Sequence, residues 1–183
     1  MTRRPHEYEE EADPFLSIGI DAEWVYESEG QNRILTYQFA VLNADSDKLS
    51  TLIIYSKSGK RISLEHGLSR ALHKARQKRV IDKVPSKFVV SGHFTRADLT
   101  TFADFGQFKR RIGAVRKSYA TTELPLQLRL ASSEGPVQCS AIIVDTMMLS
   151  PNGTSLETIG NLLGVPKITL PEGYSKDRMA LFL

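Results

Sequence analysis

The order of the apolar segments constrains the fold of this chain more than any other feature. Three segments in which apolar and polar residues alternate come first, and the short turns between them predict an antiparallel meander. Helical and strand periods then alternate, except in residues 106–122, which are basic and irregular. This succession predicts an α/β domain with a mixed sheet and flanking helices. The strands are expected at residues 15–25, 34–42, 49–55, 88–90, 126–131 and 137–144, and the helices at residues 64–80, 97–105 and 156–163.

Length and composition set the outer limits. A chain of 183 residues fits one domain, expected at 15–183 after an acidic, flexible leader at 1–14. No apolar run approaches the roughly 20 residues that a membrane span needs, so no membrane partner is expected. Cys139 is the only cysteine, which excludes an internal disulfide and favours a reducing, cytoplasmic compartment. A net charge of +3 permits an acidic partner such as nucleic acid without requiring one.

Two carboxylates stand at the end of the first predicted strand. Asp21 and Glu23 are two residues apart, so both side chains project from the same face of that strand. Two adjacent like charges are unfavourable unless a cation lies between them, and oxygen ligands suit Mg²⁺ or Mn²⁺. A solvated strand end is the alternative explanation for so short a pattern.

A third carboxylate, Asp98, lies one turn into a helix that follows a buried strand. Such a position places a side chain in the crevice at the carboxyl ends of α/β strands, although Asp98 could equally serve the helix dipole. Together, Asp21, Glu23 and Asp98 favour a two-metal site. Asp145 also ends a strand, and we expect a structural role for it, with the carboxylate held by loop amides, in preference to metal binding.

The order of these motifs resembles the DnaQ-like (DEDD) 3′–5′ exonucleases. The matching runs are IGIDAEW (18–24), VVSGHFTRADL (89–99), and VDTM (144–147) with SLETIGNLLG (155–164). The ending, residues 165–183, looks closest to the proofreading domains of protein-primed, plasmid- and phage-type family B DNA polymerases. The resemblance implies a ribonuclease H-like fold with a five-stranded mixed sheet and an inserted β-hairpin. It also implies a metal-dependent 3′–5′ exonuclease on single-stranded DNA ends, with Asp21, Glu23 and Asp98 as catalytic metal ligands.

The chain departs from that family pattern in two ways. His93 and Ala97 stand where the family usually has Asn and Phe, so the contact to the terminal nucleotide is expected to differ. The third exonuclease motif, a Tyr or His followed by Asp, is not found, and Tyr174 and Asp177 have the wrong spacing. We therefore expect a domain truncated before that motif, weakly active or inactive alone, which a polymerase domain or a second chain would complete.

Several side chains are candidates for nucleic-acid contact. Trp24 and Phe94 could stack on terminal bases, with the protein core as the alternative for each. A basic cluster, Lys109, Arg110 and Arg111, could follow the phosphates or could simply be solvated. Two other functions stay open: a stand-alone RNA or DNA nuclease of a defence or processing system, and a non-catalytic module that binds nucleic acid or protein.

Overall fold

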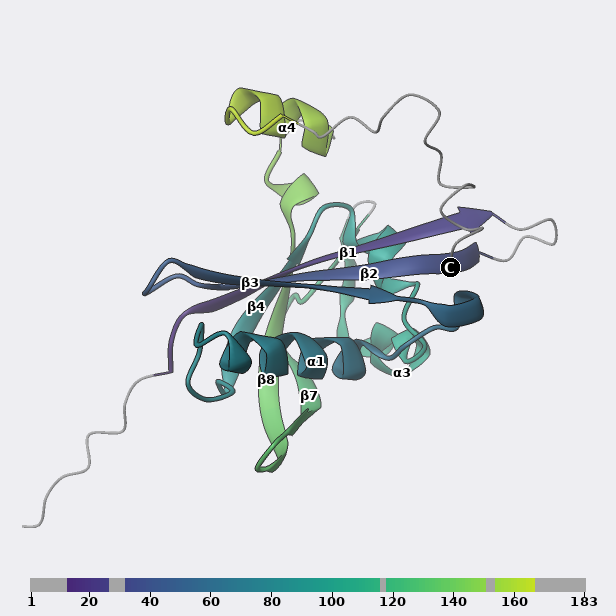
Figure 1. Ribbon diagram of the computed structural model, residues 1–183. Coiled ribbons are helices and arrows are strands. Elements are labelled where there is room, and N and C mark those ends of the chain that lie inside the picture. The colour runs from purple at the N-terminus through teal and green to yellow at the C-terminus, as the bar shows by residue number, and fades with distance from the viewer. Residues whose placement is uncertain (1–12, 27–31, 116–117, 151–153, 167–183) are drawn as a thin grey trace, which may run out of the picture.

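The computed structural model describes residues 13–26, 32–115, 118–150 and 154–166, and a six-stranded sheet forms its centre (Figure 1). The strands lie across the sheet in the order β3-β2-β1-β4-β8-β7. Their bounds are β1 Leu16–Tyr26, β2 Asn32–Asn43, β3 Lys48–Tyr55, β4 Lys87–Gly92, β7 Leu126–Ser132 and β8 Gly135–Asp145. Every predicted strand is therefore present, with ends that differ from the prediction by at most two residues.

The strand directions make the sheet mixed, as predicted. β1, β2 and β3 form the antiparallel meander, β1 runs parallel to β4, and β4 runs parallel to β8. The predicted hairpin is present as β7 and β8, and because β8 pairs with β4 from Lys87↔Ser140 to Gly92↔Asp145, the main sheet has six strands where five were expected. A second, two-stranded sheet of β5 Gly113–Val115 and β6 Ser118–Ala120 was not predicted, because such short strands show no alternation.

The helix α1 (Leu64–Gln77) begins where the sequence predicts and ends three residues early. Ser63 Oγ caps its first turn by accepting a hydrogen bond from His66 N at 3.1 Å. At the other end Arg79 adopts a left-handed conformation (φ 55°), and Val80 N donates to Ala75 O at 2.9 Å. This pairing is a Schellman motif, which terminates a helix by turning the chain back over its last turn.

The helix predicted at 97–105 is instead two short helices, α2 (Thr95–Leu99) and α3 (Phe105–Phe108). Between them the chain bonds to the segment before α1: Ala103 N donates to Ile62 O at 2.8 Å, and Asp104 Oδ1 accepts from Leu64 N at 2.8 Å. These tertiary hydrogen bonds replace the ones that a continuous helix would make. The helix α4 (Leu156–Leu162) agrees with its prediction to within one residue. The described ranges also contain the short 3₁₀ turns η1 Lys57–Gly59, η2 Lys109–Arg111 and η3 Thr146–Met148. None of the helices in the described ranges is long and apolar enough to cross a membrane.

The two faces of the sheet have different surroundings. α1 crosses one face, where Ile18, Tyr37 and Leu68 are fully buried (Figure 1). We call this the closed face. On the opposite, open face, Leu49 and Ile53 are 59% and 51% exposed. Strand alternation explains the difference, since successive side chains of each strand point to opposite faces.

Most of the expected leader, residues 1–12, lies outside the described residues. Asp13 is described, and its carboxylate accepts a hydrogen bond from Ser86 N at 2.7 Å and lies 3.7 Å from Lys83 Nζ. Ser86 Oγ also donates to Asp13 Oδ2 at 2.5 Å, and this side-chain hydrogen bond is the main reason that the pKa of Asp13 is lowered. The end of the leader region is thus attached to the loop that enters β4.

Candidate carboxylate site at the strand ends

The candidate site lies where three parallel strands end. The last pair between β1 and β4 is Gly19↔Ser91, and the last pair between β4 and β8 is Gly92↔Asp145. Asp21 therefore lies two residues past the last β1–β4 pair, at the same edge as the end of β4. Carboxyl ends of parallel strands are where ligand crevices form in open α/β sheets.

Asp98 lies at the same edge, where its side chain accepts a hydrogen bond from the backbone of β1. It lies in α2 and is only 4% exposed, and its Oδ1 accepts a hydrogen bond from Ala22 N at 3.2 Å. Burial is the main reason that its pKa is raised from 3.8 to about 7. The negative charges of Asp21 and Glu23 raise this pKa further. The structure thus brings Asp98 beside the two β1 carboxylates, across 76 residues of sequence.

Asp21 and Glu23 project from β1 as the period of two predicts. Their neighbours Ile20 and Ala22 are buried on the closed face, whereas Asp21 is exposed and Glu23 half-buried. Glu23 Oε2 is inaccessible to solvent. Directly after Glu23 the register with β2 shifts, so the alternation of β1 is interrupted just past the acidic pair.

The donor atoms of this site suit a hard divalent cation, but their arrangement is not preformed. All three side chains offer carboxylate oxygens, and a cation would relieve the repulsion that raises the pKa of Asp98. As placed, no three or more His, Cys, Asp or Glu side chains within the described residues surround a common point suited to a metal ion. Binding an ion at Asp21, Glu23 and Asp98 therefore requires at least one of these side chains to change its rotamer.

Asp145 is held by loop amides, and this structural role is the one predicted. Its Oδ1 accepts from Phe94 N at 2.9 Å and from Met147 N at 2.8 Å, and its Oδ2 accepts from Thr95 N at 2.8 Å. The side chain is 1% exposed. Asp145 thereby fixes the start of both α2 and η3 at the end of β8.

His93 and Phe94 connect β4 to α2 beside the acids. His93 shares with Asp21 a groove of about 490 Å³ on the open face, together with Gly19, Thr146 and Leu156. Phe94 is 39% exposed and adopts a left-handed backbone conformation (φ 64°), which is unfavourable for an aromatic residue and is secured here by Asp145. Phe94 is thus not a core residue, and its stacking on a base stays a prediction.

The other predicted nucleic-acid residues lie apart from this groove. Trp24 is half-buried and packs against the closed-face core, which agrees with the core position given above as the alternative to base stacking. Lys109, Arg110 and Arg111 are exposed, and the two arginines line a different hollow of about 540 Å³ with Thr122. The structure therefore does not bring the basic cluster into the groove that contains Asp21.

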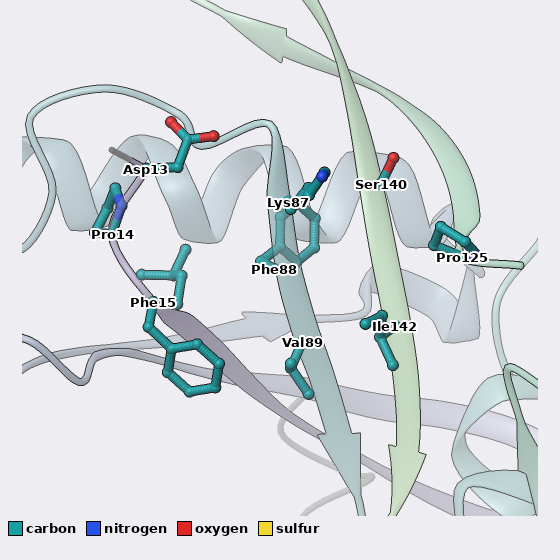
Figure 2. Close-up of a pocket in the computed structure, with 10 residues that line it drawn as sticks. Asp13, Pro14, Phe15, Lys87, Phe88, Val89, Pro125, Ser140 and Ile142 are labelled. Atoms are coloured by element: carbon teal, nitrogen blue, oxygen red, sulfur yellow. The ribbon is translucent and has the colours of Figure 1, made fainter. Parts of the chain in front are cut away.

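A further hollow of about 450 Å³ lies toward the amino ends of β1 and β4. Figure 2 shows Phe15, Val89 and Ile142 around it, with Lys87 and Asp13 at its margin. Its lining is mainly apolar and carries no cluster of catalytic side chains. The open face thus has a groove that contains Asp21 and His93 at one end of its parallel strands and a second hollow, lined by Phe15, Val89 and Ile142, at the other.

Two threonines that organise the site were not among the predicted site residues. Thr95 Oγ1 lies 2.9 Å from Ser118 Oγ and donates to Tyr119 O at 2.6 Å, which attaches α2 to β6. Thr146 Oγ1 lies 3.1 Å from His93 Nδ1. Each threonine directly follows a motif residue or lies inside a motif, but nothing in a single sequence distinguishes them from solvated threonines. The segment 167–183, where the third exonuclease motif was sought, lies outside the described residues.

Comparison with known proteins relates the chain to a polymerase. No protein family model matches it. It is 32% identical over 195 aligned residues to the primer-independent DNA polymerase PolB of Escherichia coli, and the alignment covers 94% of this chain. The chain spans 22% of the length of that polymerase. The protein is therefore related to a region of a type B DNA polymerase.

Proposed function

We propose that this chain is a metal-dependent 3′–5′ exonuclease region that acts on single-stranded DNA ends, of the proofreading type. The observation that carries the proposal is the hydrogen bond from Ala22 N to Asp98 Oδ1, which joins the second-motif carboxylate to the Asp21–Glu23 segment. The relationship to a region of a DNA polymerase supports the same conclusion. The fold also supports it: without the edge strand β7, five strands remain in the order β3-β2-β1-β4-β8, and we propose that these form a ribonuclease H-like sheet.

In this proposal the three carboxylates hold Mg²⁺ or Mn²⁺. When bound, the ions neutralise the scissile phosphate and activate water for attack on it. Asp21 is the most accessible of the three ligands, and the buried Asp98 positions its carboxylate through Ala22 N. Phe94 presents an exposed ring beside the groove, on which a terminal base can stack without sequence preference.

The test is digestion of end-labelled single-stranded DNA with Mg²⁺ or Mn²⁺. Stepwise shortening from the 3′ end is expected, and Asp21→Asn should reduce its rate at least about a hundredfold, because a group that stabilises transition-state charge is lost. Asp47→Asn is the matched control, since Asp47 is an exposed turn residue with φ 53°, a conformation that Asn tolerates. If the wild type shortens the DNA, an equal rate in Asp21→Asn would contradict the proposal. If neither protein cleaves, the metal-binding readout below decides.

A second readout needs no cleavage, which matters because the third motif was not found. Mn²⁺ should raise the melting temperature of the wild type and of Asp47→Asn, but not of Asp21→Asn. The same shift in all three proteins would show that the ion binds elsewhere.

The second candidate function is a module that binds nucleic acid without cleaving it. The absence of a preformed metal group among the described side chains favours it. A binding module should retain single-stranded DNA equally well in chelator and in Mg²⁺, whereas the proposed exonuclease should bind 3′ ends more tightly with the metal present.

A further inference from the structure

Two hydrogen bonds in series connect the end of β4 to the segment after β8. His93 Nδ1 lies 3.1 Å from Thr146 Oγ1, and Thr146 Oγ1 donates to Gly92 O at 3.1 Å. A threonine hydroxyl has a single hydrogen, and a carbonyl oxygen can only accept. The hydrogen of Thr146 is therefore used at Gly92, and Thr146 Oγ1 accepts from an N–H at His93 Nδ1.

This arrangement assigns the tautomer of the ring. A neutral imidazole carries one N–H, so a proton at Nδ1 leaves Nε2 with its lone pair. Within the described residues no hydrogen bond is made at Nε2 of His93. Since His93 lines the groove together with Asp21, the ring brings a hydrogen-bond acceptor to the proposed active site.

The backbone on both sides of this pair is fixed. Gly92 is paired with Asp145 across the parallel strands, and Phe94 N donates to Asp145 Oδ1 at 2.9 Å. On the other side Met147 N donates to the same oxygen at 2.8 Å. The backbone next to His93 and the backbone next to Thr146 are thus both bonded to Asp145. The two side chains therefore meet in one defined geometry.

We infer that Thr146 is a positioning residue, which holds His93 in the Nδ1–H form so that Nε2 accepts a hydrogen bond from the terminal nucleotide. This inference rests on the proposed function, because it takes the groove beside Asp21 as the place where a DNA end binds. A neutral acceptor next to carboxylates favours a strand end that offers a hydroxyl donor over one that ends in a phosphate, which carries charge and lacks that donor.

The tautomer can be measured without substrate. The chain has four histidines, so ¹⁵N-labelled protein at pH 8 gives four imidazole patterns in long-range ¹H–¹⁵N spectra, and His93→Gln identifies the one from His93. The wild type should show the Nδ1–H form at His93. Thr146→Val, which keeps the shape but removes the hydroxyl, should lose that form, and Thr146→Ser should restore it. An Nε2–H form in the wild type, or no change in Thr146→Val, would overturn the positioning role.

The second arm measures binding of single-stranded DNA that ends in a 3′-hydroxyl. Thr146→Val should weaken binding about threefold to tenfold, the loss expected for one hydrogen bond. Thr146→Ser should stay within about twofold of the wild type, and all variants should bind 3′-phosphate ends equally weakly. If the wild type and Thr146→Val differ in the tautomer of His93 but bind DNA with equal affinity, the proposed contact of His93 with the nucleotide is wrong. Failure of the wild type to bind any DNA end would overturn the proposed function, while the spectra would still decide the positioning role.

Discussion

The closed and open faces of the sheet are built from the same strands but serve different purposes. On the closed face, Tyr37 and Leu68 are fully buried, and Tyr37 Oη donates to Thr101 O at 2.8 Å. On the open face Ile53 and Ile142 are 51% and 49% exposed, and Asp21 and His93 line a groove. In β1 these roles alternate residue by residue, with Ile20 on one face and Asp21 on the other. Buried apolar packing is therefore concentrated under α1, whereas the opposite face leaves Asp21 and His93 at the surface of a groove.

The largest expected effect is at Asp145, whose side chain connects the end of β8 to the start of α2. Asp145→Ala should lower the free energy of unfolding by about 4 kcal/mol, because it leaves one buried and two partly buried N–H donors without their acceptor and releases the left-handed Phe94. Urea denaturation measures the change, with Asp47→Asn as the control. A loss below about 1 kcal/mol would mean that water replaces the carboxylate at this position.

Truncation of a core side chain on the closed face comes next. Leu68→Ala should lower the free energy of unfolding by about 3 kcal/mol, because Leu68 is fully buried between α1 and the sheet. The comparison is Ile53→Thr, which keeps a β-branched side chain on the open face and should change stability by less than about 1 kcal/mol. A large loss for Ile53→Thr that grows with protein concentration would show that the open face is covered in solution.

The pH dependence of stability tests the buried carboxylate beside β1. The folded-state pKa of Asp98 is raised from 3.8 to about 7, so its stabilising contribution is complete below 3.8 and is lost as the pH rises through about 7. In chelator, the wild type should therefore be less stable at pH 8 than at pH 5. Asp98→Asn, which retains an acceptor for Ala22 N, should be more stable than the wild type at pH 8 by about 2 kcal/mol.

Adding Mg²⁺ at pH 8 sharpens this test. The ion should restore stability to the wild type and leave Asp98→Asn nearly unchanged, because the substitution removes one of the proposed ligands. Melting curves at pH 5 and pH 8, with and without Mg²⁺, give all four comparisons, and identical pH profiles for the two proteins would contradict the raised pKa.

The smallest expected effect is at the edge strand β7. Glu65 Oε1 accepts from Arg129 N at 2.8 Å, and Ser69 Oγ accepts from Ala131 N at 2.9 Å, so α1 satisfies donors that an edge strand otherwise leaves open. Glu65→Ala should cost about 1 kcal/mol and speed hydrogen exchange at the amide of Arg129. Glu65→Gln keeps an acceptor oxygen and should exchange more slowly than Glu65→Ala.

Much of the fold was predictable because its signals are local. The alternation in β1 placed Asp21 and Glu23 on one face, and the helical period of α1 placed Leu64, Leu68 and Leu72 in the core. The break between α2 and α3 was not predictable. It depends on two hydrogen bonds with residues about 40 positions earlier, one donated by Ala103 N and one accepted by the Asp104 carboxylate, which no local period reveals.

The candidate site divides in the same way. The sequence alone determined which residue types could bind a cation and that two of them share a strand face, because side-chain direction in a strand follows from backbone sterics. The hydrogen bonds of Asp98 with Ala22, of Asp145 with Phe94 and Thr95, and of Thr146 with His93 depend instead on the tertiary fold. These contacts join residues 50 to 76 positions apart, and the path of the chain across the sheet determines which of them meet.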